Sequence, residues 1–279
     1  MSTINKADIM ALRNRTGAGL SDVKKALEEA NGDVEAAMDA IRKRGLAKAA
    51  KREGNTAKEG LIALRIDDLM DSQVATLIEL NAETDFVVKN ASFIALADKV
   101  LNAVADAGVS DAATGLTAAV DGKTVNDIIT EQSGTMGERI ALSRVVRMQG
   151  PAVTAYLHKT ASDLPPSIGV IVVHDKAAQP VAKDIAQHIA FANPQWRVRD
   201  EVPADVVTHE TEIARETSIN EGKPEAALPK IIEGRMNGFY KENVLEEQPL
   251  AQDAKTTVAK HLATTGGHVQ DFARIRVGS

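Results

Sequence analysis

The sequence predicts an α+β fold, and two observations indicate it. Paired runs with strand character are followed by an amphipathic helical stretch, and this order occurs twice. Residues 1–45 and a charged stretch at about 203–240 show helical spacing only. We therefore expect an N-terminal three-helix module, two related α+β core subdomains with antiparallel sheets, and an antiparallel helical hairpin.

The composition is that of a soluble globular protein, with 279 residues, 44% hydrophobic and 26% charged. The length suggests about two domains. The chain has no cysteine, which excludes disulfides and thiolate zinc sites. There is no apolar run near the ~20 residues that span a membrane, and the first residues lack the apolar centre of a signal peptide. We expect a cytoplasmic protein that does not enter a membrane.

The N-terminal module, residues 1–45, is expected to contain three short helices separated by glycine-containing breaks. Ser21 is placed to cap the second helix and Asp33 the third. Gly45 is expected to end the third helix, because glycine is favoured just beyond a helix C-terminus. Residues 46–59, rich in Ala and Lys, are expected to be a linker.

The first core subdomain is expected over residues 60–150. Runs at 61–66 and 73–80 predict an antiparallel pair of strands, and the apolar spacing over 92–107 predicts a helix. A second helix is expected around 125–129. The short acidic turn between the two strands needs no catalytic role.

The second core subdomain is expected over residues 151–279. Its unit opens with three strand-like runs, and Pro180 begins the helix that follows them. The two units share an order of strands and then a helix, which indicates a structural duplication. The strands predicted for this unit, in chain order, are 145–148, 153–158, 168–173 and 269–277.

Residues of about 203–240 differ in kind from the two cores. Pro203 opens a charged run with few large apolar residues, and residues 222–224 form a sharp turn before a return helix. Two helices with so little apolar surface cannot enclose a core of their own. We therefore expect them to protrude as a hairpin.

The turn after the second strand, residues 81–88, is the most unusual segment. It places Asp85 beside Phe86 in a chain with only five phenylalanines. One interpretation is that the aromatic ring contacts another molecule. The other is that Thr84 or Asp85 caps a helix and Phe86 is buried in the core.

The charge of the chain is uneven. The net charge is −6, but residues 1–54 carry +3, with much of the excess in the stretch 42–52. That stretch predicts either a nucleic-acid or ribosome contact, or a solvated helix end and linker. The lack of interleaved aromatic residues favours the second interpretation.

Motifs for catalysis are missing from the sequence. There is no phosphate-binding loop of the G-x-x-x-x-G-K-[ST] type, no nucleophile elbow, and no metal-ligand spacing among the six histidines. We expect no catalytic residues, no metal and no cofactor, and hence a protein that is not an enzyme.

Three ordered segments resemble signatures of the bacterial elongation factor Ts family: residues 12–27, residues 84–87 and residues 233–249. The resemblance covers nearly the whole chain. It implies a ubiquitin-associated-like module at 1–45, a linker, two related core subdomains and a coiled coil inserted in the second. One departure is Ser167, where the family usually has Arg before Ile-Gly.

The resemblance also implies a function. Family members bind elongation factor Tu·GDP and promote GDP release, so that GTP can rebind, without covalent catalysis. It implies three groups of partner-binding residues: an exchange wedge of Thr84, Asp85, Phe86 and Val87; an N-terminal group of Arg13, Gly17, Gly19, Leu20 and Ser21; and a second-core group of Gly137, His158, Ile168 and Gly169.

On this resemblance no direct nucleic-acid binding is expected, and the hairpin is expected to make a peripheral contact or to support self-association. The alternative is a nucleic-acid or ribosome-associated adaptor that uses the basic stretch 42–52.

Overall fold

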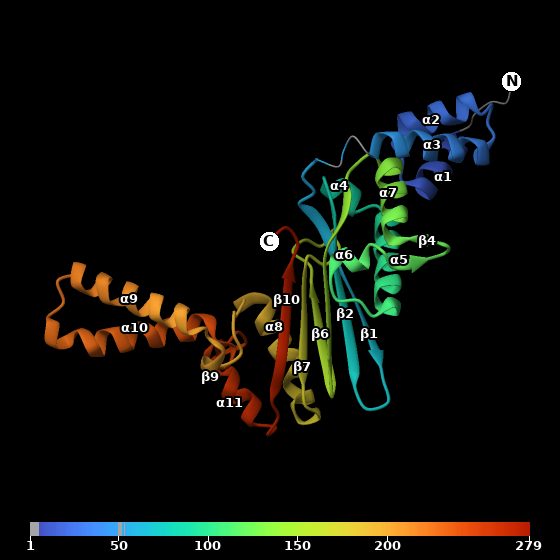
Figure 1. Ribbon diagram of the computed structural model, residues 1–279. Coiled ribbons are helices and arrows are strands. Elements are labelled where there is room, and N and C mark those ends of the chain that lie inside the picture. Colours follow the sequence, from blue (N-terminus) through green and yellow to red (C-terminus); the bar gives the residue numbers. More distant parts are fainter. Residues whose placement is uncertain (1–5, 50–51, 53) are drawn as a thin grey trace.

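The computed structural model describes residues 6–49, 52 and 54–279. Its centre has four layers, in which two antiparallel sheets pack face to face and helices cover their outer faces (Figure 1). This confirms the predicted α+β class. The first sheet has the order β1-β2-β5, with β1 Glu59–Asp68, β2 Gln73–Ala82 and β5 Ile140–Gly150. The second has the order β10-β7-β6, with β6 Ala152–His158, β7 Ile168–His174 and β10 Val269–Arg276.

The outer face of the first sheet is covered by α5 (Ala91–Ala107) and α7 (Val125–Met136). Helix α5 begins where the Asn90 side chain accepts the Ser92 N–H, and it ends at Gly108, whose φ of 68° is left-handed. Its apolar residues recur at helical spacing and pack around the fully buried Phe93. The helix predicted over 92–107 is confirmed.

The outer face of the second sheet is covered by α8 (Gln179–Ala192) and α11 (Val258–Ala263). Pro180 lies in the first turn of α8, as predicted, where its missing N–H costs no hydrogen bond. Within this layer His188 is buried. Its Nε2 lies 2.8 Å from the Gln248 side-chain oxygen, and its Nδ1 accepts the Ala251 N–H at 3.1 Å.

The inner faces of the two sheets share one apolar core, made of Ile62, Ala75, Leu77, Val153, Ile171, Val173 and Ile275. Gly169 allows this close approach, because a Cβ there would lie 2.5 Å from Cγ2 of Ile62. The grouping of 145–148 with the second unit is wrong. These residues lie in β5, which pairs with β2 in the first sheet, and Val145 packs in the core under α5 and α7.

A buried carboxylate joins the sheets at one edge. Glu79 of β2 is 2% exposed and lies 2.5 Å from Nε of Arg144 on β5. The same carboxylate accepts the Gly278 N–H at 2.9 Å, and Arg144 donates to the Arg276 carbonyl. The residues after β10 are thereby fastened to the first sheet.

The N-terminal module consists of α1 (Lys6–Thr16), α2 (Leu20–Glu29) and α3 (Val34–Ala49) around a small apolar core. Asp33 caps α3 as predicted, by accepting the N–H groups of Glu35 and Ala36. Ser21 does not cap α2. The N-cap is Gly19, because the helix starts one residue before Ser21.

Gly45 does not end α3, which continues to Ala49. The glycine serves a helix crossing instead. A Cβ on Gly45 would lie 2.6 Å from the carbonyl carbon of Gly134 in α7, and a Cβ on Gly134 would overlap the Gly45 backbone. Only a pair of glycines lets the two helix backbones approach so closely.

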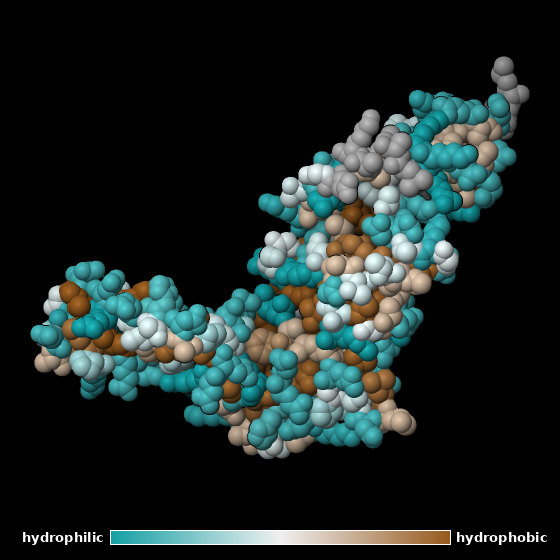
Figure 2. All heavy atoms as spheres, viewed as in Figure 1, coloured by the Kyte–Doolittle hydropathy of each residue, from teal (hydrophilic) through white to brown (hydrophobic). Residues whose placement is uncertain are grey.

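Helices α9 (Ala204–Asn220) and α10 (Leu228–Asn243) lie side by side and project away from the four layers (Figure 1). Their buried contacts are few: Ala214, Ser218, Leu228 and Met236. On the face drawn in Figure 2, hydrophobic residues gather along the line between these helices and over the centre of the core. At the base, the Trp196 and Phe239 rings lie 6.1 Å apart, and the Arg199 guanidinium lies 4.3 Å above the Tyr240 ring.

The sequence patterns missed the shortest elements, which are too brief to show a period. They are α6 Ala112–Gly115, β3 Ala119–Val120, β4 Lys123–Thr124, β8 Pro249–Leu250 and β9 Asp253–Thr257, whereas α4 Asp85–Val88 begins directly after Thr84, where one interpretation expected a helix start. In the part of the chain that the structure describes, no helix combines the length and apolar character needed to cross a membrane.

Candidate functional site

The turn after β2 presents Phe86 to solvent. One helical turn, α4, follows Thr84, and the next residues anchor it: Val88 is 1% exposed, and Val87 packs against the first core. Phe86 is 80% exposed. The interpretation in which Phe86 is buried is therefore wrong, and the ring is available to another molecule.

One carboxylate holds the residue that begins α4. The Thr84 N–H and hydroxyl both donate to Glu138, at 2.9 and 2.6 Å. Glu138 directly follows Gly137, which ends α7 with a left-handed φ of 77°. Ser133 donates to the Glu138 carbonyl at 2.5 Å and fixes that bend. Gly137 thus lies one residue from the carboxylate that binds Thr84.

A second carboxylate supports the same turn. Glu83 accepts the Arg139 N–H at 2.6 Å, the Arg52 guanidinium at 3.1 Å and the Asn55 amide at 3.0 Å. Burial alone would raise the pKa of Glu83, but these hydrogen bonds outweigh it and lower the pKa below its usual value. Glu83 is therefore ionised at neutral pH and ties the segment after α3 to the turn.

Asp85 takes part in an ion pair that reaches the second core. Lys89 lies 3.0 Å from Asp85 and 2.8 Å from Asp163, which belongs to the loop between β6 and β7. Lys89 donates hydrogen bonds to Asp163 and to Asp85, and these bonds, the one to Asp163 first, raise the pKa of Lys89. The pair is partly exposed and adds little stability, but it gives Asp85 a defined orientation.

The N-terminal group lies beside this turn. Gly17 has a left-handed φ of 74°, and a Cβ there would be 3.1 Å from the Asn90 side chain. The Ser92 hydroxyl donates to the Asn14 carbonyl at 3.2 Å. Arg13, Gly19 and Ser21 are exposed, and Leu20 is 53% exposed. The structure therefore brings the two groups to one end of the molecule (Figure 1).

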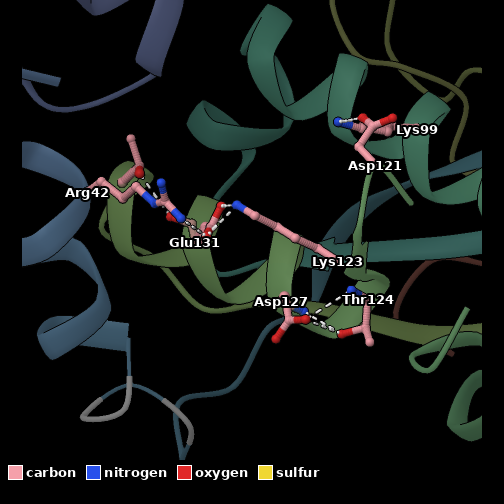
Figure 3. Close-up of polar contacts among 8 residues, drawn as sticks. Arg42, Lys99, Asp121, Lys123, Thr124, Asp127 and Glu131 are labelled. Carbon is pink, nitrogen blue, oxygen red and sulfur yellow. Dashed lines mark hydrogen bonds and ion pairs between the residues drawn. The ribbon is translucent and has the colours of Figure 1, made fainter. Parts of the chain in front are cut away.

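Charged contacts fasten the module to the first core. Figure 3 shows Glu131 of α7 between Arg42 of α3 and Lys123 of β4, each at 2.6 Å. Burial raises the pKa of Glu131, but the hydrogen bonds from Lys123 and Arg42 outweigh it, and the net pKa is lowered. In the same view Thr124 and Asp127 form the capping box that starts α7. Lys99 and Asp121 join α5 to the β3–β4 turn at 2.6 Å.

The arginines of the basic stretch that the structure describes are engaged within the chain. Arg42 pairs with Glu131, Arg44 with Glu29, and Arg52 with Glu83. A phosphate backbone would have to compete with these carboxylates. These contacts involve the arginines only, and Lys43 of the same stretch is exposed.

The residues of the second-core group differ in exposure to solvent. His158 is half-buried at the end of β6. Its Nδ1 lies 3.1 Å from the Tyr156 hydroxyl, and its ring meets the edge of Phe191 at 5.0 Å. Ile168 is 7% exposed, and Gly169 is buried between the sheets. The Ile168 side chain therefore packs in the core, and the missing side chain of Gly169 lets the two sheets approach each other.

Sequence reasoning missed three residues of these surfaces. Phe191 is 63% exposed, and it lies two positions past Ile189, off the apolar face of α8, so helical periodicity could have found it. Glu138 gave no local signal, and Lys89 lies four residues after Asp85, a spacing that can predict that pair but not the pair with Asp163. Their partners Thr84 and Asp163 are 54 and 74 residues away, and only the fold brings them together.

A groove of about 640 Å³ lies between the module and the first core, with Asn14, Ser92, Leu96, Lys99, Ile128 and Glu131 among its lining residues. Its charged residues are already paired with each other or with neighbouring side chains. Within residues 6–49, 52 and 54–279, no three His, Asp or Glu side chains gather closely enough to hold a metal ion.

Comparison with known proteins gives a consistent result. The sequence pattern of the family described as "Elongation factor TS" matches residues 83–279. Proteins named "Elongation factor Ts" from Beutenbergia cavernae, Pseudarthrobacter chlorophenolicus and Micrococcus luteus are 50%, 49% and 49% identical to this chain. Each alignment covers 100% of this chain and 100% of the relative. The chain therefore belongs to the elongation factor Ts family and is a translation elongation factor.

Proposed function

We propose that this chain binds elongation factor Tu in its GDP-bound form and promotes release of GDP, so that GTP can rebind. The observation that supports it most is Phe86, an apolar ring that is 80% exposed on a turn held from several sides. A ring of this size gains about 1.5–3 kcal/mol when it is fully buried. Most of that free energy is still available for a partner.

The mechanism follows from differential binding. Insertion of Phe86 between elements of the partner favours the arrangement in which the nucleotide is held weakly. Linkage is reciprocal: the chain weakens GDP binding by the same factor by which GDP weakens binding of the chain. No bond is made or broken, and members of this family are exchange factors rather than enzymes in the usual sense.

The N-terminal module supplies a second contact in this proposal. Arg13 and the exposed Leu20 lie on the helices that flank the Gly17 turn, at the same end of the molecule as Phe86. Leu20 offers an apolar contact and Arg13 a charged one. The contact of Asp85 with Lys89 gives its carboxylate a defined orientation beside the ring, and in this proposal that carboxylate accepts a hydrogen bond from the partner.

The test is release of a fluorescent GDP analogue from elongation factor Tu with the chain in catalytic amounts. The wild-type chain should accelerate release, and Phe86→Ala should slow the catalysed rate by about 30-fold, because an interface anchor is worth about 2 kcal/mol. Met70→Ala is the matched control. Met70 is fully exposed on the β1–β2 turn, at the opposite end of the strands from Thr84.

An unchanged rate in Phe86→Ala would refute the role of the ring, and no acceleration by the wild-type chain would refute the exchange function. Circular dichroism should show both variants folded, because neither side chain is buried.

A further inference from the structure

We propose that Glu138 is a positioning residue for exchange: it acts through Thr84 to set the direction in which Phe86 projects. The inference rests on the proposed function for its effect on GDP release, and on contacts within this chain for its effect on the turn. Glu138 itself is not assigned a contact with the partner.

The first step is that α4 cannot orient Phe86 unaided. It has four residues, which is a single turn, and isolated helical turns are unstable because nucleation is costly. The Thr84 side chain does not cap this turn. It donates instead to Glu138, as the Thr84 N–H does, so one carboxylate binds both hydrogen-bond donors of the residue that directly precedes the turn.

The second step is that the exposed ring has little packing of its own. Phe86 is 80% exposed, so the backbone of residues 84–87 determines where its ring lies. On the inner side, Val88 is buried and resists displacement. On the outer side, the contact that fixes the backbone two residues before the ring is the pair of hydrogen bonds to Glu138.

The third step is that Glu138 is itself held. Residues 83–84 and 138–139 form reciprocal hydrogen bonds, because Glu83 accepts the N–H of Arg139 and Glu138 accepts the N–H of Thr84. The Glu138 carbonyl accepts the Ser133 hydroxyl. Hydrogen bonds to an ionised acceptor are shorter and stronger than neutral ones, so this reciprocal arrangement makes a stiff support.

The experiment compares Glu138→Ala with Asp111→Ala in the GDP-release assay. Asp111 is the matched control, because its carboxylate accepts the Thr114 N–H at 2.8 Å at another helix start of the same core. Glu138→Ala should lower the maximal exchange rate by about tenfold, since two hydrogen bonds that orient the turn are lost. Asp111→Ala should change it by less than about twofold. Exchange by Glu138→Ala at the wild-type rate would overturn the inference.

Two further variants separate positioning from general loss of stability. Glu138→Gln should restore most of the rate, because its side-chain oxygen still accepts the Thr84 N–H, and its amide N–H can donate to the Thr84 hydroxyl oxygen in place of the bond that this hydroxyl donates to Glu138. In a Phe86→Ala background, Glu138→Ala should cause no further loss, since it acts through the missing ring. A full additional tenfold loss in that background would show a merely structural role and overturn the inference.

A separate readout distinguishes failure of this inference from failure of the exchange function. Amide hydrogen exchange of residues 84–88 should be faster in Glu138→Ala than in Asp111→Ala or the wild-type chain. If the wild-type chain does not accelerate GDP release, the proposed function is refuted, and this measurement still decides whether Glu138 holds the turn. Unchanged protection of these amides would refute it.

Discussion

The crossing of α3 and α7 gives the sharpest prediction, and the perturbation is Gly45→Ala. Its Cβ would lie 2.6, 2.8 and 3.0 Å from the carbonyl carbon, the oxygen and the Cα of Gly134. Ordinary carbon contacts lie at about 3.5–4.0 Å, so the helices would have to separate by roughly 1 Å. Backbone atoms cannot rotate away as a flexible side chain can.

The magnitude follows from two opposing effects. Alanine is better than glycine within a helix by about 1 kcal/mol, which favours the variant. Overpacking costs about 1–3 kcal/mol, and the upper end applies because both neighbours are backbone. We expect a net loss of about 2 kcal/mol in the free energy of unfolding. Separation of the helices would also stretch the Arg42–Glu131 pair beside the crossing.

The control is the same substitution in a helix with open space. Gly234 of α10 has no atom within 4 Å of an added Cβ, so Gly234→Ala should stabilise by up to about 1 kcal/mol. The two variants therefore differ in sign. Urea unfolding followed by circular dichroism should separate their midpoints by about 1 M or more. A Gly45→Ala protein as stable as Gly234→Ala would refute the tight crossing.

Two further predictions concern buried polar groups. Burial lowers the pKa of His188, although its bond with Gln248 opposes this, so below about pH 6.5 the unfolded chain binds a proton that the folded chain does not. The free energy of unfolding should therefore fall as the pH drops from 6.5 toward the pKa of His188 in the folded chain. Between pH 7.5 and 5.5 the urea midpoint should fall less in His188→Gln than in the wild-type chain. An equal fall in the two proteins would contradict a lowered pKa of His188. Glu79→Ala leaves Arg144 without its buried partner and should cost about 3 kcal/mol, near the low end for a broken buried pair because Arg144 is 34% exposed. Urea unfolding measures this cost, and a loss below about 1 kcal/mol would show that the ion pair is dispensable.

The parts of the fold that sequence predicted are those with a clear apolar pattern. Helices α5 and α8 each bury one face, which leaves helical spacing in the sequence, whereas β1 and β2 are covered on both faces and therefore read as nearly continuous apolar runs. Gly45 was misjudged because a glycine that ends a helix and a glycine that admits another helix look the same locally. The partner, Gly134, is 89 residues away.

The sequence could predict which residues form the candidate site, but not which contacts hold them in place. The pair Asp85–Phe86 stood out because an aromatic beside a carboxylate is unusual at a turn. Whether the ring was buried or exposed depended on how α4 packs, and in the structure Val88 is buried in the first core while Phe86 is exposed. The contacts of Glu138 with Thr84 and of Lys89 with Asp163 join segments far apart in sequence, so no local pattern predicts them.

The docking of α3 on α7 has a consequence for affinity. Two contact groups joined by a loose tether bind with an effective concentration set by the length of that tether. Here the Gly45–Gly134 crossing and the Glu131 bridge hold the group around Gly17 at a fixed offset from Phe86. Under the proposed function the chain then binds its partner through two contact groups that are already fixed relative to each other. Once the first group is bound, the second lies near its own contact, and the conformational entropy of the segment between them has already been lost on folding.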